Sequence, residues 1–177
     1  MMHSGVEFRI SVTTMFSPTV KIPTLYLDTS VIGGYFDAEW MADTRELWTQ
    51  ARAGRWHVLT SIVTERELQA APENVRMLFR DTFQSANDLL MATEEAEDLA
   101  QEYLRAGVVS RKFADDALHV AICSTHRINH LVSWNFKHLV NVRREAGFNA
   151  VNLLQGYPSV SIVNPKELIY GDTDDIS

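Results

Sequence analysis

Short apolar runs alternate with amphipathic segments along most of the chain. Runs rich in β-branched and aromatic residues indicate strands, whereas apolar residues that recur every three or four positions indicate helices. The predicted strands are 24–27, 56–60, 89–91, 131–134 and 160–163. The predicted helices are 39–53, the segment between Ser61 and Pro72, 73–83, the segment between Thr93 and Gly107, 111–127, 137–146 and one that begins at Asn164. Strands that alternate with helices imply a mostly parallel sheet covered on both faces, which is an α/β fold.

Capping residues support several of these boundaries. Thr60 or Ser61 can cap the helix after the second strand, and Thr93 can cap a helix that carries glutamates in its first turn. Gly107 suits the end of that helix, because glycine readily adopts the left-handed conformation common after a last helical turn. A short apolar run at 150–153 has no assigned element.

The two ends of the chain differ from this pattern. In residues 1–22 apolar residues alternate with more polar neighbours, which is the period of a half-buried strand. The alternating residues are Val6, Phe8, Ile10 and Val12. Three explanations stay open: an extra edge strand, a disordered leader, or sequence upstream of a start at Met15. We therefore expect an N-terminal extension at 1–22, one domain at 23–170 and a flexible tail at 171–177.

Composition and charge narrow the classes of function. A chain of 177 residues that is 46% hydrophobic can bury the core of one domain. Its formal charge of −7 argues against a broad basic surface that coats nucleic acid, but not against a nuclease whose acidic site binds a cation. The single cysteine, Cys123, is expected to be a buried small hydrophobe. No run approaches the length of a membrane span and no secretory signal is recognisable, so we expect a soluble, cytoplasmic protein.

Four polar positions are the candidate site residues. Asp28 and Asn135 follow predicted strands, and the carboxyl ends of parallel strands are where α/β proteins bind ligands. Glu67 and Asp116 lie on the apolar faces of predicted helices, where a carboxylate is costly unless it is paired, hydrogen-bonded or bound to a cation. Oxygen-rich sites of this kind suit Mg²⁺. Helix phase alone does not separate Asp116 from its neighbour Asp115.

Each of these residues also has an ordinary structural explanation. Asp28 suits a strand end because aspartate favours turns and caps. Glu67 can pair with an arginine, and Asp116 can cap or pair. The functional interpretation depends on the recurrence of oxygen ligands at two strand ends and in two helices.

Four sequence motifs resemble those of a known family. They are Leu25-Tyr26-Leu27-Asp28-Thr29-Ser30, Glu67-Leu68, Asp116-Ala117-Leu118-His119-Val120-Ala121 and Leu131-Val132-Ser133-Trp134-Asn135. Over about residues 24–163, their order and rough spacing resemble those of PIN domains, the Mg²⁺- or Mn²⁺-dependent nucleases that include the VapC-type toxins of toxin–antitoxin pairs. The resemblance implies a three-layer α/β/α sandwich that hydrolyses single-stranded RNA. It also implies a homodimer and an antitoxin as partner.

The resemblance assigns a role to each matching residue. The implied metal ligands are Asp28, Glu67 and Asp116. Asn135 lies where many members have a further aspartate; its amide can offer a carbonyl oxygen but no charge, so the number of metal ions stays open. Thr29 and Ser133 are implied to orient a carboxylate or a phosphate. We interpret His119 as a core histidine or one that supports a ligand, since nothing else supplies a zinc set.

Basic and aromatic residues beside two of the motifs suggest how RNA would be held. We hypothesise that five cations supply phosphate contacts because they flank the motifs of Asp116 and Asn135. They are Arg111, Lys112, Lys137, Arg143 and Arg144. Among the tryptophans, Trp134 is the candidate for stacking on a base because it adjoins Asn135.

Two other functions are weighed against the nuclease. A catalytically impaired PIN-like module that binds RNA or a protein partner is favoured by Asn135 and by the acidic composition. A phosphatase-like α/β hydrolase is less well supported, because Asp28 is followed by Thr-Ser-Val and not by the second aspartate of an Asp-x-Asp pair.

Overall fold

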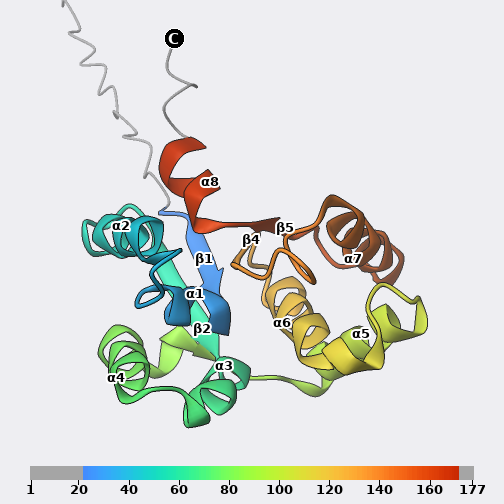
Figure 1. Ribbon diagram of the computed structural model, residues 1–177. Coiled ribbons are helices and arrows are strands. Elements are labelled where there is room, and N and C mark those ends of the chain that lie inside the picture. The colour runs from blue at the N-terminus through green and yellow to red at the C-terminus, as the bar shows by residue number, and fades with distance from the viewer. Residues whose placement is uncertain (1–21, 172–177) are drawn as a thin grey trace, which may run out of the picture.

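A computed structural model describes residues 22–171 of the chain (Figure 1). The alternating segment from Val6 to Val12 and the predicted tail beyond Gly171 lie outside the described residues. None of the helices in the described range is long and apolar enough to cross a membrane.

Five parallel strands form the central sheet. They are β1 (Thr24–Leu27), β2 (His57–Ser61), β3 (Leu89–Leu90), β4 (His130–Val132) and β5 (Ser161–Val163). Their order across the sheet is β3-β2-β1-β4-β5, and every neighbouring pair is parallel. Tyr26 at the centre pairs with Leu59 of β2 and Leu131 of β4. The predicted α/β fold with a parallel sheet is therefore confirmed.

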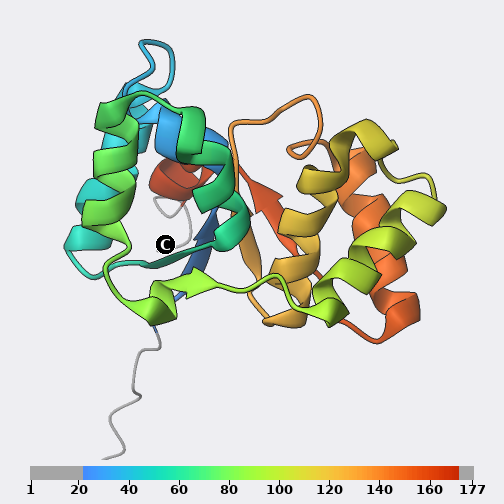
Figure 2. The ribbon, with the colours of Figure 1, turned by 90° about the horizontal axis from the view of Figure 1, so that it is seen from below.

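Side chains on β1 alternate between two hydrophobic cores. Tyr26 belongs to the core on one face of the sheet, whereas Leu25 and Leu27 belong to the core on the other. Helices α5 (Glu94–Arg105), α6 (Ala114–Thr125) and α7 (Val142–Gln155) cover the face of Tyr26. Helices α1 (Thr29–Gly34), α2 (Met41–Arg52), α4 (Glu73–Thr82) and α8 (Pro165–Tyr170) cover the opposite face. Figure 2 shows the two groups of helices on either side of the sheet, which is the predicted three-layer sandwich.

The predicted capping residues begin and end the helices as expected. Ser61 caps α3 (Ile62–Glu67), because its side chain accepts the backbone N–H of Val63. Thr93 caps α5 in the same way by accepting the N–H of Ala96. Gly107, which follows the C-cap residue Ala106 of α5, has a φ of 72°, the left-handed conformation that favours glycine.

Helix α7 corrects two sequence expectations. It begins at Val142, not at residue 137, and it continues through the apolar run at 150–153. The side chain of Asn141 caps it by accepting the N–H groups of Arg143 and Arg144. The preceding residues form a turn, in which the backbone carbonyl of Asn135 accepts two N–H groups.

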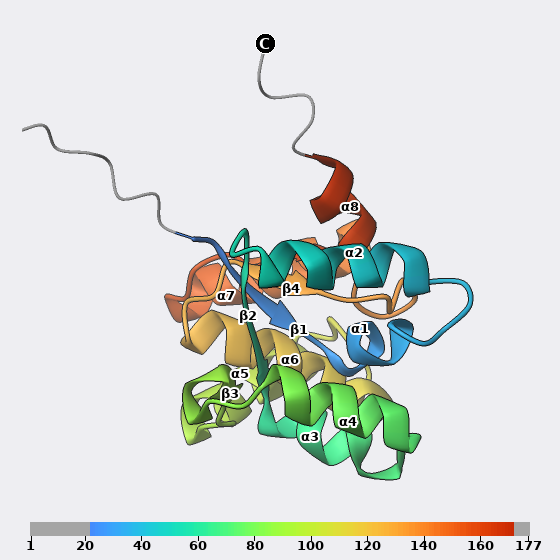
Figure 3. The ribbon, with the colours of Figure 1, turned by 90° about the vertical axis from the view of Figure 1, so that its left-hand side faces the viewer.

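Helix α1 was not expected from the sequence. Asp28 caps it by accepting the N–H of Val31, and the helix continues through Gly33 and Gly34. Figure 3 shows this short helix between α2 and α4, immediately after the central strand. The predicted helix at 111–127 is also divided: a 3-10 turn at Arg111–Phe113 precedes α6.

Candidate metal centre

The candidate residues gather at the carboxyl edge of the three central strands. Asp28 follows β1, Ser133 follows β4, and Ser61 ends β2 and leads into α3. Because these strands are neighbours and parallel, their last residues lie at one edge of the sheet. Helix α6, in the helical layer on the Tyr26 face of the sheet, brings Asp116 and His119 to this edge.

Asp28 is a buried carboxylate held at both oxygens. It is 4% exposed; its Oδ1 accepts Ser30 Oγ at 2.6 Å and Val31 N at 3.2 Å. Its Oδ2 accepts Ser133 Oγ at 2.5 Å. Burial raises the pKa of Asp28, although His119 and these hydrogen bonds oppose the rise. The hydroxyl of Ser133 thus orients Asp28 directly.

Glu67 receives two polar contacts from other elements. Thr29 Oγ1 donates to Glu67 Oε2 from the first turn of α1. His119 Nε2 lies 3.3 Å from the same oxygen. Burial raises the pKa of Glu67, but the hydrogen bond and charge of His119, followed by Thr29, lower it overall. The glutamate therefore faces inward from α3 while the neighbouring Glu65 is exposed.

His119 links this carboxylate to the centre of the sheet. It is 2% exposed, and its Nδ1 lies 2.6 Å from Tyr26 Oη, which in turn lies 2.6 Å from Ser61 Oγ. Burial lowers the pKa of His119, but the hydrogen bond and charge of Glu67, followed by the charges of Asp28 and Asp116, raise it overall. Three carboxylates thus favour the protonated form of this imidazole.

Asp116 and Asp115 have different surroundings, which helix phase alone did not resolve. Asp115 is exposed and pairs with Arg66 at 2.7 Å. Asp116 is half-buried, and its Oδ1 accepts Asn135 Nδ2 at 3.2 Å. Burial raises the pKa of Asp116 to about 6; His119 opposes the rise, whereas the charges of Asp28 and Glu67 add to it. The three predicted carboxylates therefore lie close enough to repel one another.

Asn135 presents a donor to this site. Its Oδ1 accepts the backbone N–H of His138 at 3.1 Å. A backbone N–H can only donate, so this bond sets the amide orientation and turns Nδ2 toward Asp116. The sequence suggested that Asn135 could offer its carbonyl oxygen to a metal. In the structure that oxygen is held by the turn after β4.

The acidic residues do not form a ready-made cage for a metal ion. Within residues 22–171, no group of three or more histidine, cysteine, aspartate or glutamate side chains is arranged to hold one. Mg²⁺ is commonly held by one or two carboxylates and keeps several of its waters. Mutually repelling carboxylates, one with a pKa raised to about 6, are groups whose charge such a cation would offset.

Three of the proposed RNA-binding cations gather around one aromatic pair. The rings of Phe113 and His138 stack at 3.6 Å, and Lys112 Nζ lies 5.7 Å from the ring centre of Phe113. Burial lowers the pKa of His138, and so do the charges of Lys137, Arg144 and Lys112. The 3-10 turn before α6, the turn after β4 and the start of α7 thus bring these three cations together around His138.

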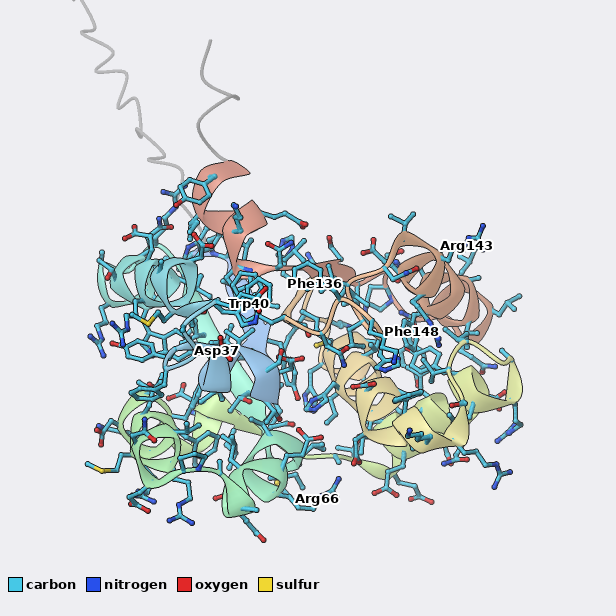
Figure 4. The ribbon with its side chains drawn as sticks, in the orientation of Figure 1. Asp37, Trp40, Arg66, Phe136, Arg143 and Phe148 are labelled. Carbon is cyan, nitrogen blue, oxygen red and sulfur yellow. The ribbon has the colours of Figure 1, made fainter. Side chains whose placement is uncertain are left out.

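The other two cations lie apart from this aromatic pair. Arg111 is exposed in the 3-10 turn that precedes α6. Arg143 is exposed on the outer side of α7 (Figure 4). Arg144, although near His138, donates to the backbone carbonyl of Val108 and so has a structural role as well.

The structure adds aromatic residues that sequence reasoning did not select. Trp134 is only 7% exposed, and Trp40 stacks on it with ring centres 4.5 Å apart. Phe136, which is 44% exposed, lies 5.6 Å from Trp40. Isolated tryptophans are usually core residues, so the sequence carried no signal for Trp40. Ser30 was part of a motif, but its bond to Asp28 was not expected.

Fold and site together define an α/β protein with acidic residues at the carboxyl edge of a parallel sheet. No family model matches the sequence, and neither does any curated protein. Among solved structures, a chain of VapBC2 from Rickettsia felis, crystallised bound to a DNA fragment from its promoter, has a TM-score of 0.47 and 14% identity. A chain of FitAcB from Neisseria gonorrhoeae has a TM-score of 0.48 and 15% identity. Each match covers 80% of this chain and 98% of the other. A likeness this weak carries no argument about function.

Proposed function

We propose that the protein is a divalent-metal-dependent endoribonuclease that cleaves single-stranded RNA. The observation that supports this proposal is the position of Asp28, Glu67 and Asp116 at the carboxyl edge of the sheet, where Ser133 holds Asp28, His119 contacts Glu67 and Asn135 donates to Asp116. Burial raises the pKa of Asp116 to about 6, and the charges of Asp28 and Glu67 add to the rise. The four PIN-like motifs in the sequence support the same assignment.

The residues of the site have two roles, binding of the metal ion and orientation of its ligands. Asp28, Glu67 and Asp116 would hold Mg²⁺ or Mn²⁺, while Ser133 and Thr29 orient two of these carboxylates. When bound, the cation supplies charge that offsets the negative charge developing on the phosphodiester, and it activates water for attack on phosphorus.

Cations outside the acidic cluster would hold the substrate. Lys112 and Lys137, with Arg111 in the preceding turn, lie beside the first turn of α6 and the end of β4. Phosphate contacts from such residues give affinity without sequence preference. An acidic protein needs them locally, because its overall charge of −7 repels RNA.

Cleavage of a labelled single-stranded RNA tests the proposal. The wild-type protein should cleave it with Mg²⁺ or Mn²⁺ and stop when EDTA is added. Asp116→Asn should reduce cleavage at least about 100-fold, whereas the matched control Asp115→Asn, which changes an exposed neighbour, should retain it. Equal activity of the two variants, or activity that survives EDTA, would contradict the proposal.

Two observations favour a second candidate, a catalytically impaired module that binds RNA or a protein partner. Residue 135 is an asparagine where many PIN domains have an aspartate, so the site has one carboxylate fewer. The amide oxygen of Asn135 is also occupied, because it accepts the backbone N–H of His138. Helix α7 also exposes large apolar side chains: Val142 is 87%, Leu153 80% and Leu154 83% exposed. Binding of RNA without cleavage under any metal condition would select this candidate.

The toxin role and the partners belong to the same proposal. We expect the protein to be the toxin of a type II toxin–antitoxin pair and to form a homodimer. Light scattering after size-exclusion chromatography tests the dimer. Co-expression with a small DNA-binding protein encoded beside it tests the antitoxin, which should co-purify with the chain and suppress its toxicity.

A further inference from the structure

A groove of about 640 Å³ opens beside the acidic site on the side of α1 and α2. Its lining includes Ser30, Phe36, Asp37, Trp40, Asn74 and Trp134. Its volume lies in the range of small-molecule sites and is ample for one nucleotide. No arginine or lysine lines it within the described part of the chain, so its chemistry does not suit a phosphate.

Ser30 connects this groove to the candidate metal centre. Its hydroxyl donates to Asp28 Oδ1 at 2.6 Å and accepts the backbone N–H of Trp134 at 2.8 Å. One side chain therefore lines the groove and also positions a proposed metal ligand. A molecule lying in the groove therefore lies next to the residue that holds Asp28.

The aromatic wall of the groove is fixed in place. Trp134 Nε1 donates to Thr44 Oγ1 at 2.9 Å. A side chain at Gly34 would place its Cβ 2.8 Å from the Trp134 ring, so glycine allows α1 to approach the ring closely. Trp40 stacks on this ring at an interplanar angle of 24°. Figure 4 shows Trp40 on the same side of the molecule as Asp37, and an aromatic surface held in this way stacks on a base without being ordered first.

Asp37 supplies the one charged side chain among the described residues that line the groove. Its Oδ1 accepts the backbone N–H of Glu39 at 2.8 Å, which anchors the carboxylate in its turn. Within residues 22–171 no group donates a hydrogen bond to its other oxygen. A carboxylate in such a position recognises a planar ring that carries N–H donors on its edge.

We propose that this groove binds a guanine base next to the scissile phosphate, with its ring against Trp40 and its donor edge toward Asp37. Guanine presents two adjacent donors, N1–H and the 2-amino group, which one carboxylate can accept together. Each of the other bases offers a single donor group with at least one acceptor beside it, and a carboxylate repels that acceptor. The assignment rests on the proposed nuclease function and names a base preference for it.

Binding can be measured separately from cleavage. Asp116→Asn protein, full length and without nuclease activity, is titrated with the four nucleoside 5′-monophosphates while tryptophan fluorescence is followed. Guanosine monophosphate should quench the signal at concentrations at least about tenfold below those of the other three. Adding Asp37→Asn should weaken this binding about tenfold, and Trp40→Leu should remove the quenching. Glu39→Gln is the matched control, because it removes an exposed carboxylate two residues from Asp37 and should change neither.

Cleavage by the active protein distinguishes a failure of the groove proposal from a failure of the proposed nuclease function. If the wild-type protein cuts RNA beside guanines and Asp37→Asn loses this preference while still cutting, the groove is the base site. If it cuts RNA with no preference that Asp37 or Trp40 alters, the groove proposal is overturned and the nuclease stands. If it does not cut RNA but guanosine monophosphate binds through these residues, the nuclease fails and the base site remains. Four monophosphates that all fail to bind, as expected for a groove that receives a partner's side chain, overturn the proposal.

Discussion

His119 and Glu67 form a hydrogen-bonded pair, an ion pair when the imidazole is protonated, in which Nε2 lies 3.3 Å from the carboxylate Oε2. The histidine side chain is 3% exposed and that of the glutamate 27% exposed, so the pair is shielded from much of the solvent. It joins α6 to α3 across the carboxyl edge of the sheet. Without a metal ion, this imidazole offsets part of the carboxylate charge and competes for Glu67.

This pair should make the largest contribution of His119 to the stability of the metal-free protein in mildly acidic solution. Despite its burial, the pKa of His119 is raised by Glu67, so its stabilising contribution is complete below its ordinary pKa of 6.5 and is lost as the pH rises through the folded value. Despite burial, the pKa of Glu67 is lowered by His119, so that contribution is complete above 4.5 and is lost as the pH falls. His119→Gln should therefore lower the free energy of unfolding by about 1–3 kcal/mol between about pH 4.5 and the raised pKa of His119, and by less outside this range.

Urea unfolding in EDTA from pH 4 to pH 9 measures this difference. Glutamine keeps a donor for Glu67 but cannot be protonated. It also loses the contact of Nδ1 with Tyr26, which is present at every pH in this range, so the part of the difference that changes with pH reports the charge. A difference between wild type and variant that is constant across the pH range would show that His119 is neutral throughout.

Removing the charge of Asp116 should stabilise the metal-free protein. The pKa of Asp116 is raised to about 6, chiefly by burial, so the folded protein favours its protonated form, and ionisation destabilises the fold as the pH rises from about 4 to 6. In EDTA at pH 7.5, Asp116→Asn should raise the melting temperature by about 3 °C, and the gain should vanish near pH 4.

Differential scanning calorimetry, with and without Mn²⁺, checks this and the metal site together. Mn²⁺ should raise the melting temperature of the wild type but not that of Asp116→Asn, because a ligand stabilises only the state that binds it. Asp115→Asn loses only an exposed pair with Arg66 and should show no gain in EDTA. A melting temperature that falls in Asp116→Asn would mean that the carboxylate is stabilised by a partner other than the metal.

The sheet could be predicted because its strands carry a local signal. β1 was predicted at 24–27 and found there, and the other strands differ by one or two residues at their ends. Helix boundaries depended on residues whose role is visible only in three dimensions. No element was predicted at Gly33 and Gly34, yet packing against α2 and α4 and the cap from Asp28 make them helical. Asn141 overrode the helical pattern that began near residue 137.

For the site, the sequence indicated which residues would meet but not how each is oriented. Asp28, Glu67 and Asp116 reach one edge of the sheet because the fold is regular. The direction of the Asn135 amide depends on a backbone N–H in its own turn, which no periodicity encodes. The stacking of Trp40 on Trp134 joins segments far apart in the chain, so the exposed member of that pair could not be identified beforehand.

Asn135→Asp should strengthen metal binding at the expense of metal-free stability. A fourth carboxylate would replace the amide donor that Asp116 now receives, raising the pKa of Asp116 further and destabilising the apo protein above pH 6. The added charge should tighten Mn²⁺ binding about tenfold by isothermal titration calorimetry. Asn141→Asp, at the exposed cap of α7, is the control for a new carboxylate outside the site. Unchanged Mn²⁺ affinity in Asn135→Asp would mean that residue 135 does not face the metal.

Reversing the charges at Lys112 and Lys137 should weaken RNA binding through electrostatics alone. Both lysines lower the pKa of His138, so they act on one region although they come from different elements. Each phosphate contact with a single strand contributes roughly 0.7 to the slope of log affinity against log salt concentration. Losing both should therefore reduce that slope by about 1.4.

Fluorescence anisotropy with a labelled single-stranded RNA, in the Asp116→Asn background that prevents cleavage, measures this slope. Lys166→Glu on α8 reverses an exposed charge on the helix that packs against α2, on the opposite face of the sheet from α6, and should leave it unchanged. The affinity of Lys112→Glu/Lys137→Glu should depend less on salt but still fall as salt increases, because Arg111 remains.

If both variants show the wild-type slope, RNA does not pass over the turn between Asn135 and His138. If Lys166→Glu alone reduces it, the binding track lies on the α2 and α8 side of the sheet.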